Sequence, residues 1–385
     1  KHNRGFGSAN LAGWTLEGVG FTFPNVSIPE GGFLVIAANE AAFRAQHPNV
    51  LNLIGGWNGR LSNRGESLRL LNHTGAEIDR VDYADSGDWA RRRPGSDDRG
   101  HTGWIWDNPA DGGGRSLEVR NLHSRNDLGQ NWTFSAVEGG TPGAPNSVRQ
   151  VNVAPFIEDV SHHPAVPGPR DLVLVRARLS DDLSSPIRGV VHHRVSSLAP
   201  TPFASTVMRD DGTGGDEVAR DNIYTAVLPA QPEGATVEFY LEAFDRIQSR
   251  TWPAAAHENG LQEANLLYQV DSEQPAGEAP FYRFILSAGE LEEFLKIPFD
   301  SPERDTNARF NATFIANVDG KTATRYQCAL RLRGSGTRSR YPRNLKIELP
   351  SSTPWKGRDE LNLNVQFSYN QLLGSMFYRA AGLPA

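Results

Sequence analysis

The chain has one cysteine, Cys328, so no internal disulfide can form and stability must come from packed cores. It has no run of apolar residues near the roughly 20 needed to cross a bilayer, and its first residues do not read as a signal peptide. It also lacks an excess of positive charge. A formal net charge of −6 argues against general nucleic-acid binding, so any recognition of anions must be local.

Glycine and proline, by contrast, are abundant. The chain holds 38 glycines and 25 prolines in 385 residues, which suits a β-rich protein with many turns. The length favours two or three domains over one. With 38% hydrophobic and 22% charged residues, the composition is that of a globular protein. We therefore expect a mainly β chain of several modules.

Residues 1–148 alternate short apolar runs with turn clusters such as NRGE and NHTG, a pattern typical of a β-sandwich. This region resembles the lamin tail domain, an immunoglobulin-like sandwich, through the segments LAGWTL, IPEGGFLVIAAN, LSNRGESLRLLNHTGAEIDRVDY and NWTFSAVEGGTPGAPN. The resemblance covers most of residues 8–146. Members of that family open with a further strand, which we expect to be missing here.

Residues 149–272 predict a second β-rich module. The segments DLVLVRARLSDD and ATVEFYLEAFD both alternate in polarity, and the second places Val237, Phe239 and Leu241 on one face. The spacing of strands and turns fits a small sandwich of immunoglobulin or fibronectin type III character.

Residues 273–385 predict mixed α and β structure. A helix is predicted after Ser287, with Ser287 and Glu290 at capping-box positions. A hairpin is predicted to turn at Asp319 and Gly320, and the segments NLKIEL and ELNLNV predict further strands. A last helix is predicted from Ser368.

The most unusual segment, residues 329–350, sets six cations against one acid, Glu348. Alternation in RYQCALRLR predicts that Arg331 and Arg333 face away from the apolar side of their strand, which holds Tyr326. If NLKIEL is a neighbouring strand, Lys346 shares the face of the two arginines. The Gly- and Ser-rich loop between the strands would add free backbone amides. The six cations are Arg331, Arg333, Arg338, Arg340, Arg343 and Lys346.

Guanidinium groups beside a flexible loop suit phosphate binding. The alternative from the residues alone is a strand surface on which arginines pair with carboxylates, with GSG as an ordinary hairpin turn. The segment is not a Walker A sequence.

A second resemblance, to the spore-coat protein H (CotH) family of atypical protein kinases, covers most of residues 305–385. It is carried by DTNARFNATFIANVDGK, CALRLRGSGTRSRYPRNLKIELP and WKGRDELNLNV. In that family the RLRG strand and the basic strand after it help to form the nucleotide-binding lobe. The family more often has Lys-Lys-Ser where this chain has Arg-Asn-Leu, so the residue that replaces the nucleotide-binding lysine stays open. The resemblance implies nucleotide contacts for Arg331, Arg333, Gly334, Arg343 and Lys346.

Phosphoryl transfer also needs carboxylates that hold Mg²⁺. The resemblance implies that these acids, and with them the catalytic residues, lie downstream of Ala385. Asp359 and Glu360 fit no metal-binding motif. We therefore expect a parent protein that uses ATP and Mg²⁺, and a chain that does not turn over ATP alone.

Acidic residues gather in DDGTGGDEVARD, and the candidates for a Ca²⁺ site are Asp210, Asp211, Asp216 and Asp221. Dense carboxylate oxygens repel one another, and Ca²⁺ would relieve that repulsion. The ligand spacing is not that of an EF-hand. The alternative is a turn in which the aspartates accept hydrogen bonds from nearby amides.

Other reactive residues give weaker signals. Cys328 lies in an apolar run and is expected to be buried filler. The pairs at 162–163 and 192–193 are adjacent histidines, so each pair should split across two strand faces rather than share a metal. Spacing nominates no Ser-His-acid or Cys-His set. The mixed-charge segment 91–100 is expected to be a solvated loop. The tryptophans are expected to be core or loop anchors, with a carbohydrate-stacking surface as the alternative.

The sequence therefore predicts two immunoglobulin-like β-sandwiches, at 1–148 and 149–272, followed by an α+β partial kinase-like domain at 273–385. The favoured function is that of a fragment of a multidomain extracytoplasmic bacterial CotH-like kinase, secreted or on the cell surface. Its sandwiches would bind a protein or a cell-surface polymer, with no nucleic-acid partner and no membrane span. The alternative is a non-catalytic surface adhesion or scaffold protein.

Overall fold

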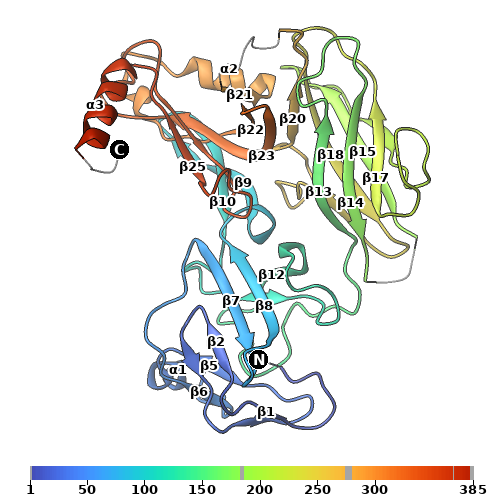
Figure 1. The fold of residues 1–385 in the computed structure, drawn as a ribbon, viewed down its shortest axis with the longest axis vertical. Coiled ribbons are helices and arrows are strands. Elements are labelled where there is room, and N and C mark those ends of the chain that lie inside the picture. The colour runs from blue at the N-terminus through green and yellow to red at the C-terminus, as the bar shows by residue number, and fades with distance from the viewer. Residues whose placement is uncertain (1, 183–185, 274–279, 367, 382–385) are drawn as a thin grey trace. The chain divides into compact units, whose positions relative to one another are not determined.

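The computed structural model describes residues 2–182, 186–273, 280–366 and 368–381. The chain is mainly β, with 39% of residues in strands and 9% in helices, and its strands form several sheets (Figure 1). This confirms the expected fold class at that level. The chain divides into two compact units, residues 1–91 with 106–153 and residues 92–105 with 154–385.

The first unit consists of small sheets. Its largest is antiparallel, with strand order β3-β2-β7-β8, while β1 pairs with β4, β11 pairs with β12, and β5 and β6 run parallel. Its elements are β1 (Ala9–Asn10), β2 (Thr15–Glu17), β3 (Phe21–Thr22), β4 (Ser27–Ile28), β5 (Val35–Ala37), α1 (Glu40–Gln46), β6 (Leu53–Gly55), β7 (Gly65–Leu71), β8 (Glu77–Ala84), η1 (Gly87–Trp89), β11 (Leu117–Val119), η2 (Gly129–Asn131) and β12 (Trp132–Phe134).

Local chemistry explains the turns and ends of these elements. The NHTG turn between β7 and β8 is held by Asn72, whose Oδ1 accepts from the backbone N–H of Thr74 and of Ala76, each at 2.9 Å. Helix α1 begins after Asn39, whose side chain accepts from the N–H of Ala42 at 2.9 Å. The unit's core includes Leu11, Phe23, Ile28, Leu34 and Leu70.

The second unit contains two sheets that share one core, β13-β14-β17 and β16-β15-β18-β19, with β20 also paired to β18 (Figure 1). The predicted alternation in ATVEFYLEAFD is confirmed, because Val237, Phe239 and Leu241 are each at most 1% exposed. The strands are β13 (Phe156–His163), β14 (Val173–Ser180), β15 (Arg188–Val195), β16 (Ala204–Val207), β17 (Ile223–Leu228), β18 (Thr236–Phe244), β19 (Ser249–Trp252) and β20 (Leu266–Gln269).

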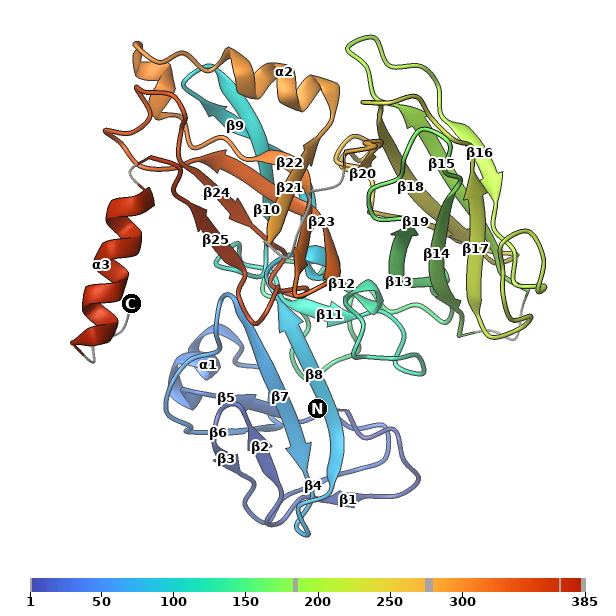
Figure 2. The same cartoon turned by 45° about the horizontal axis from the view of Figure 1, so that its top comes forward.

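The rest of the second unit is built on a five-stranded antiparallel sheet in which each strand pairs with the next, β21-β22-β23-β24-β25 (Figure 2). The predicted hairpin at Asp319 and Gly320 is confirmed, and both residues take the positive φ that its tight turn needs, 53° and 69°. The elements are β21 (Phe281–Leu286), α2 (Ala288–Lys296), η3 (Pro302–Asp305), β22 (Phe310–Val318), β23 (Lys321–Leu332), β24 (Leu345–Glu348), β25 (Glu360–Leu363) and α3 (Ser368–Ala380).

Strand β23 carries a bulge that the sequence pattern did not reveal. Gln327 has a φ of +52°, and the pairing with β22 shifts register between Ala312 and Phe314. Tyr326 therefore packs in the core of the two paired sheets, while Cys328 packs in the core of the five-stranded sheet. The prediction that Tyr326 shares the apolar side of the rest of the strand is wrong for this reason.

Residues 92–105 form a hairpin that belongs to the second unit, made by β9 (Arg91–Asp98) and β10 (His101–Asp107). The backbone N–H of Trp104 donates to the carbonyl of Arg309 at 2.7 Å. Arg92 is 3% exposed and donates to the carbonyl of Cys328 at 3.3 Å. The expectation of a solvated loop at 91–100 is therefore wrong. Within the described ranges, none of the helices has the length and apolar character required to span a bilayer.

Candidate functional site

The basic residues of β23 and β24 lie side by side, as the sequence predicted. The two strands are antiparallel neighbours, and Arg331 is directly opposite Lys346. Cross-strand partners project from the same face of a sheet. The side chains are also largely covered, at 18% exposed for Arg331 and 14% for Lys346.

A single carboxylate, that of Glu348, lies among these cations. Its Oε1 is 2.9 Å from Nε of Arg331 and 3.6 Å from Nζ of Lys346, and its Oε2 is 2.7 Å from Nε of Arg309. Burial alone would raise the pKa of Glu348, but the hydrogen bonds and charges of Arg309 and Arg331 outweigh burial and lower it. Glu348 is therefore ionised, and its carboxylate links Arg309, Arg331 and Lys346.

Lys346 has a second acidic partner. Its Nζ lies 2.8 Å from Oε2 of Glu360, a residue of β25 whose side chain is 40% exposed. The ion-pair network of this face thus contains three cations, from Arg309, Arg331 and Lys346, and two carboxylates, from Glu348 and Glu360. One positive charge of this network is not matched by a carboxylate within it.

Arg333 and Gly334 stand where β23 passes into the basic loop. The guanidinium of Arg333 donates to the side-chain oxygen of Asn364, and its backbone N–H donates to the carbonyl of Asn344 at 2.9 Å. Gly334 has a φ of +84°, and a Cβ there would lie 2.4 Å from Oγ1 of Thr337. Glycine is required at 334 by the backbone turn itself.

Two arginines of the loop, Arg338 and Arg343, donate to carbonyl groups of the same unit. Arg338 is 5% exposed and donates to the carbonyls of Thr306 at 2.6 Å and of Leu332 at 3.1 Å. Arg343 donates to the carbonyl of Ile297 at 2.9 Å and to that of Pro298, and its guanidinium lies 3.7 Å from the ring centroid of Phe299. These contacts fix the loop to the segment that follows α2. Arg343 is thereby turned toward that segment.

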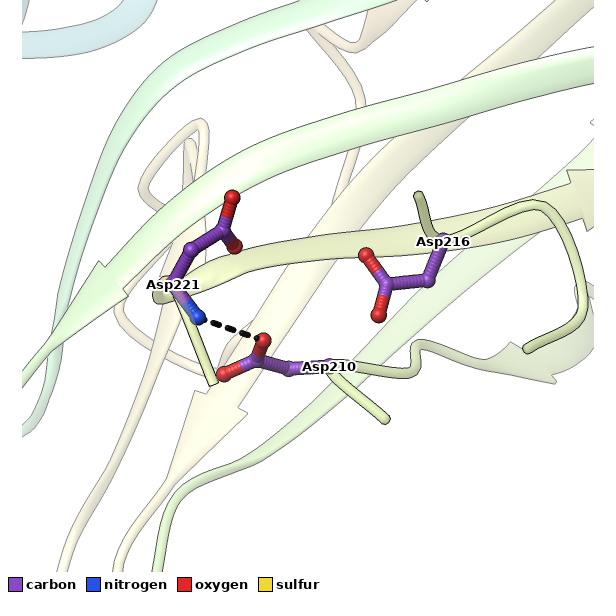
Figure 3. Close-up of side chains that lie close together, drawn as sticks. All are labelled: Asp210, Asp216 and Asp221. Atoms are coloured by element: carbon purple, nitrogen blue, oxygen red, sulfur yellow. Dashed lines mark hydrogen bonds between the residues drawn. The ribbon is translucent and has the colours of Figure 1, made fainter. Parts of the chain in front are cut away.

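The acidic loop is the second candidate site (Figure 3). One carboxylate oxygen from each of Asp210, Asp216 and Asp221 lies within 4.8 Å of the other two. Asp210 accepts from the backbone N–H of Asp221 at 3.1 Å and of Asn222 at 3.3 Å, one bond to each oxygen. Both of its oxygens therefore help to close the loop, as in the predicted turn.

The other two carboxylates of the loop each accept one backbone hydrogen bond. Asp216 is 7% exposed and accepts from the N–H of Gly212 at 2.6 Å, and Asp221 accepts from that of Ile223 at 2.9 Å. Asp211 lies outside this group of three. Its carboxylate accepts from the N–H and the hydroxyl of Thr213, and this bonding lowers its pKa. Of the four predicted ligands, three are brought together.

The remaining predictions concern buried or paired side chains. Cys328 is fully buried, and burial raises the pKa of its thiol to about 12, so it is not a nucleophile. In each histidine pair one member is buried, His162 at 6% and His193 at 8% exposed, while its neighbour faces the other side of the strand. Trp89 and Trp104 are buried, at 6% and 8% exposed, as expected of anchors.

Sequence patterns missed a buried cluster between the 92–105 hairpin and helix α2. Glu290 accepts from the indole N–H of Trp104 and from the backbone N–H of Asn311 at 3.0 Å. Glu293 lies one helical turn after Glu290, and its Oε1 is 2.8 Å from Nδ1 of His101. Burial raises the pKa of Glu290 to about 7, although the Trp104 and Asn311 hydrogen bonds oppose the shift. The only signal for this cluster in the sequence was the Trp-rich strand at 101–107.

No protein-family model matches this chain, and a search of curated proteins finds no match.

Proposed function

We propose that the five-stranded sheet of residues 281–363 is part of the nucleotide-binding lobe of a CotH-like atypical kinase. The parent would be a multidomain extracytoplasmic bacterial protein, and the β-sheet modules before the lobe, of immunoglobulin-like type, would attach it to a protein or a cell-surface polymer. The observation that carries the proposal is the directly opposed pair of Arg331 and Lys346 with one uncompensated positive charge beside it.

Lys346 is the residue best suited to meet a phosphate. Its partner Glu360 is 40% exposed, so a phosphate oxygen can take the place of that carboxylate at modest cost. Glu348 would keep Arg331 and Lys346 in position, because its Oε1 lies within ion-pair distance of both. Arg333, at the end of β23, would add a second contact by exchanging its neutral partner Asn364 for an anion. When bound, ATP would supply the phosphoryl group for transfer.

The residues fit Mg²⁺ less well than they fit phosphate. Both oxygens of Glu348 are already bonded to arginines, and Glu360 pairs with Lys346. A Mg²⁺ site needs carboxylate oxygens that are free to coordinate the ion. This supports the view that the chain can bind a nucleotide but does not transfer its phosphate.

Titration of the chain with ATP and Mg²⁺ in a calorimeter tests the proposal. We expect binding that weakens at least about tenfold in Lys346→Ala, the usual effect of losing one charge-assisted contact. Arg340→Ala is the matched control, since Arg340 is an exposed cation of the same loop. Absence of binding, or equal affinity in both variants, would reject the nucleotide site. Phosphotransfer by the purified chain would reject its predicted inactivity.

The second candidate function is a non-catalytic adhesion or scaffold protein. It is favoured because several of the cations already have partners within the protein. Arg338 and Arg343 donate to carbonyl groups, and Arg331 pairs with Glu348. On this reading the cluster serves stability alone. The same titration separates the two functions, because the scaffold predicts no heat with ATP.

A further inference from the structure

A hydrogen-bonded chain of serine, histidine and glutamate lies on the outer face of the sheet β16-β15-β18. Oγ of Ser205 is 2.9 Å from Nδ1 of His192, and Nε2 of His192 is 3.1 Å from Oε2 of Glu242. The three residues come from β16, β15 and β18. We propose that Ser205 is a nucleophile for acyl transfer, with His192 as its general base and Glu242 as the positioning residue.

The strands place these side chains with little freedom. His192 is opposite Ser205 on one side and opposite Tyr240 on the other, so all three share one face. The imidazole is stacked on the Tyr240 ring, with centroids 4.6 Å apart and planes 14° apart. Stacking and two hydrogen bonds together fix the orientation of the base, as an activated nucleophile requires.

The proton positions follow from the partners. An ionised carboxylate can only accept, so Nε2 of His192 carries the proton that faces Glu242. Nδ1 is then the acceptor that can take the hydroxyl proton of Ser205. Relative to the arrangement of the serine proteases, the two ring nitrogens exchange roles. The hydrogen bonds still link the nucleophile to the base and the base to the acid, as in those enzymes.

The surroundings of Ser205 are open and partly apolar. Ser205 is exposed, and Val207, two residues along the same face of β16, is 51% exposed. Phe203, just before the strand, packs against the Tyr240 ring of this face with centroids 5.0 Å apart. These side chains suit a short acyl group; the nearby cation, Arg194, lies 4.1 Å from the Phe203 ring centroid and is already paired with Glu238. The substrate class that fits this open face is therefore a short-chain ester.

The backbone N–H of Ser205, at the edge of the sheet, is a hydrogen-bond donor for the oxyanion that develops during acyl transfer. The N–H of Met208 bonds to the carbonyl of Gly189 at 2.9 Å, so bonded and non-bonded positions alternate from there along β16. Ser205 falls at a non-bonded position, and its N–H points away from β15. Among the described residues no strand pairs with this outer edge of β16. The N–H of Ser205 can thus bond to a carbonyl oxygen under attack by its own Oγ.

The reaction balances with water alone. Oγ of Ser205 bonds to the ester carbonyl carbon while its proton moves to Nδ1 of His192. The alcohol leaves with that proton as the carbon–oxygen ester bond breaks. Water, deprotonated by the same nitrogen, then attacks the acyl-serine and releases the carboxylic acid, and the proton returns to Oγ. This inference does not depend on the proposed nucleotide site.

A fluorophosphonate probe and p-nitrophenyl acetate test the inference on the full chain. We expect the probe to label one residue, and Ser205→Ala to lose the label together with ester hydrolysis above background. His192→Ala should slow labelling by about 10²-fold, the lower range for a general base. Ser249→Ala is the matched control, because it removes an exposed serine from β19 of the same sheet. No labelling, or labelling that survives Ser205→Ala, would overturn the assignment.

A thiol at position 205 allows a second test, because the pH dependence of its alkylation would not change if His192 had only a structural role. In Ser205→Cys the new thiol can be alkylated selectively, because the natural Cys328 is 0% exposed. We expect its alkylation to extend to lower pH than in a variant that also carries His192→Ala, since a neighbouring imidazolium favours the thiolate. Identical pH profiles for the two variants would overturn the role of His192. The exposed position of Ser205 makes both variants compatible with folding.

Discussion

Two regions of the second unit differ in how far their polar side chains are covered and bonded to partners. On the five-stranded sheet, and between it and the 92–105 hairpin, most charged side chains are held by partners within the unit, as for Glu348 at 20% exposed. On the sheet β16-β15-β18 the polar chain is a short hydrogen-bonded series that ends at the exposed Ser205. The covered network holds the structure together, and the open series leaves a reactive group available. Substitutions should therefore change stability in the first region and reactivity in the second.

The largest effect is expected from Glu348→Ala. The variant leaves Arg309, Arg331 and Lys346 crowded without the carboxylate that holds them. Loss of one partner from a covered ion-pair network costs about 3–5 kcal/mol. We expect the free energy of unfolding, measured in urea, to fall by that amount. Glu360→Ala is the control at the exposed end of the network and should cost no more than about 1 kcal/mol. Equal losses would mean that the covered carboxylate of Glu348 stabilises the fold no more than the exposed carboxylate of Glu360 does.

The next effect depends on pH and concerns Glu290. Its pKa is raised from 4.5 to about 7, mainly by burial, with Glu263 adding to the shift and Arg92 opposing it. Between those two pH values the unfolded chain has lost this proton and the folded chain has kept it. Stability therefore falls as pH rises from about 4.5 to 7 and stays low above that window.

Glu290→Gln should remove this loss, since the amide oxygen still accepts from Trp104 and Asn311. We expect the variant to be about 2–3 kcal/mol more stable than the parent at pH 8, and similar to it at pH 4.5. Unfolding midpoints across pH 4.5–8 measure the difference. Glu292→Gln, on the exposed side of the same helix, should leave the pH profile of the parent unchanged.

Contacts between strands adjacent in the sequence could be predicted, and contacts between distant strands could not. Alternation and turn residues were enough to place Arg331 beside Lys346, because β23 and β24 are consecutive and antiparallel. The same alternation failed at Tyr326, where a bulge at Gln327 reverses the faces of the strand. A bulge depends on the packing of two cores, and one strand's sequence does not contain that information.

The grouping of His192, Ser205 and Glu242 was not predicted either. Strands β15 and β16 are consecutive and antiparallel, but the short strand β16, ASTV, has no alternation of polarity that would set its register. Ser205 is 13 residues from His192 and Glu242 is 50 residues away. Only the strand order β16-β15-β18 and its register bring the three together. Without that register, the residue types alone do not show which serine, histidine and acid are neighbours. For this reason no Ser-His-acid set could be nominated from spacing.

A smaller effect is expected in the acidic loop, where Asp210→Ala removes the acceptor of two backbone amides. Leaving those amides without a partner should lower the free energy of unfolding by about 1–3 kcal/mol. Asp211→Ala is the neighbouring control and should cost less, since Asp211 is exposed and its partners are Thr213 and the exposed cation Arg209. Because Asp210 already uses both oxygens, we expect unfolding curves in Ca²⁺ and in EDTA to coincide. Stabilisation by Ca²⁺ that Asp216→Asn abolishes would show instead that the three carboxylates bind the ion.

The smallest effect on stability is expected from Ser205→Ala. Ser205 is exposed on an edge strand, and within the part of the chain that the structure describes its hydroxyl bonds to His192 alone. Substitutions at such surface positions usually change stability by less than about 0.5 kcal/mol. The imidazole keeps Glu242 and the Tyr240 ring after the substitution, so the sheet has no reason to rearrange. Urea unfolding of this variant should therefore superimpose on that of the parent. A loss comparable to that of Glu348→Ala would mean that the serine is a structural partner, and that both regions use their polar side chains for stability alone.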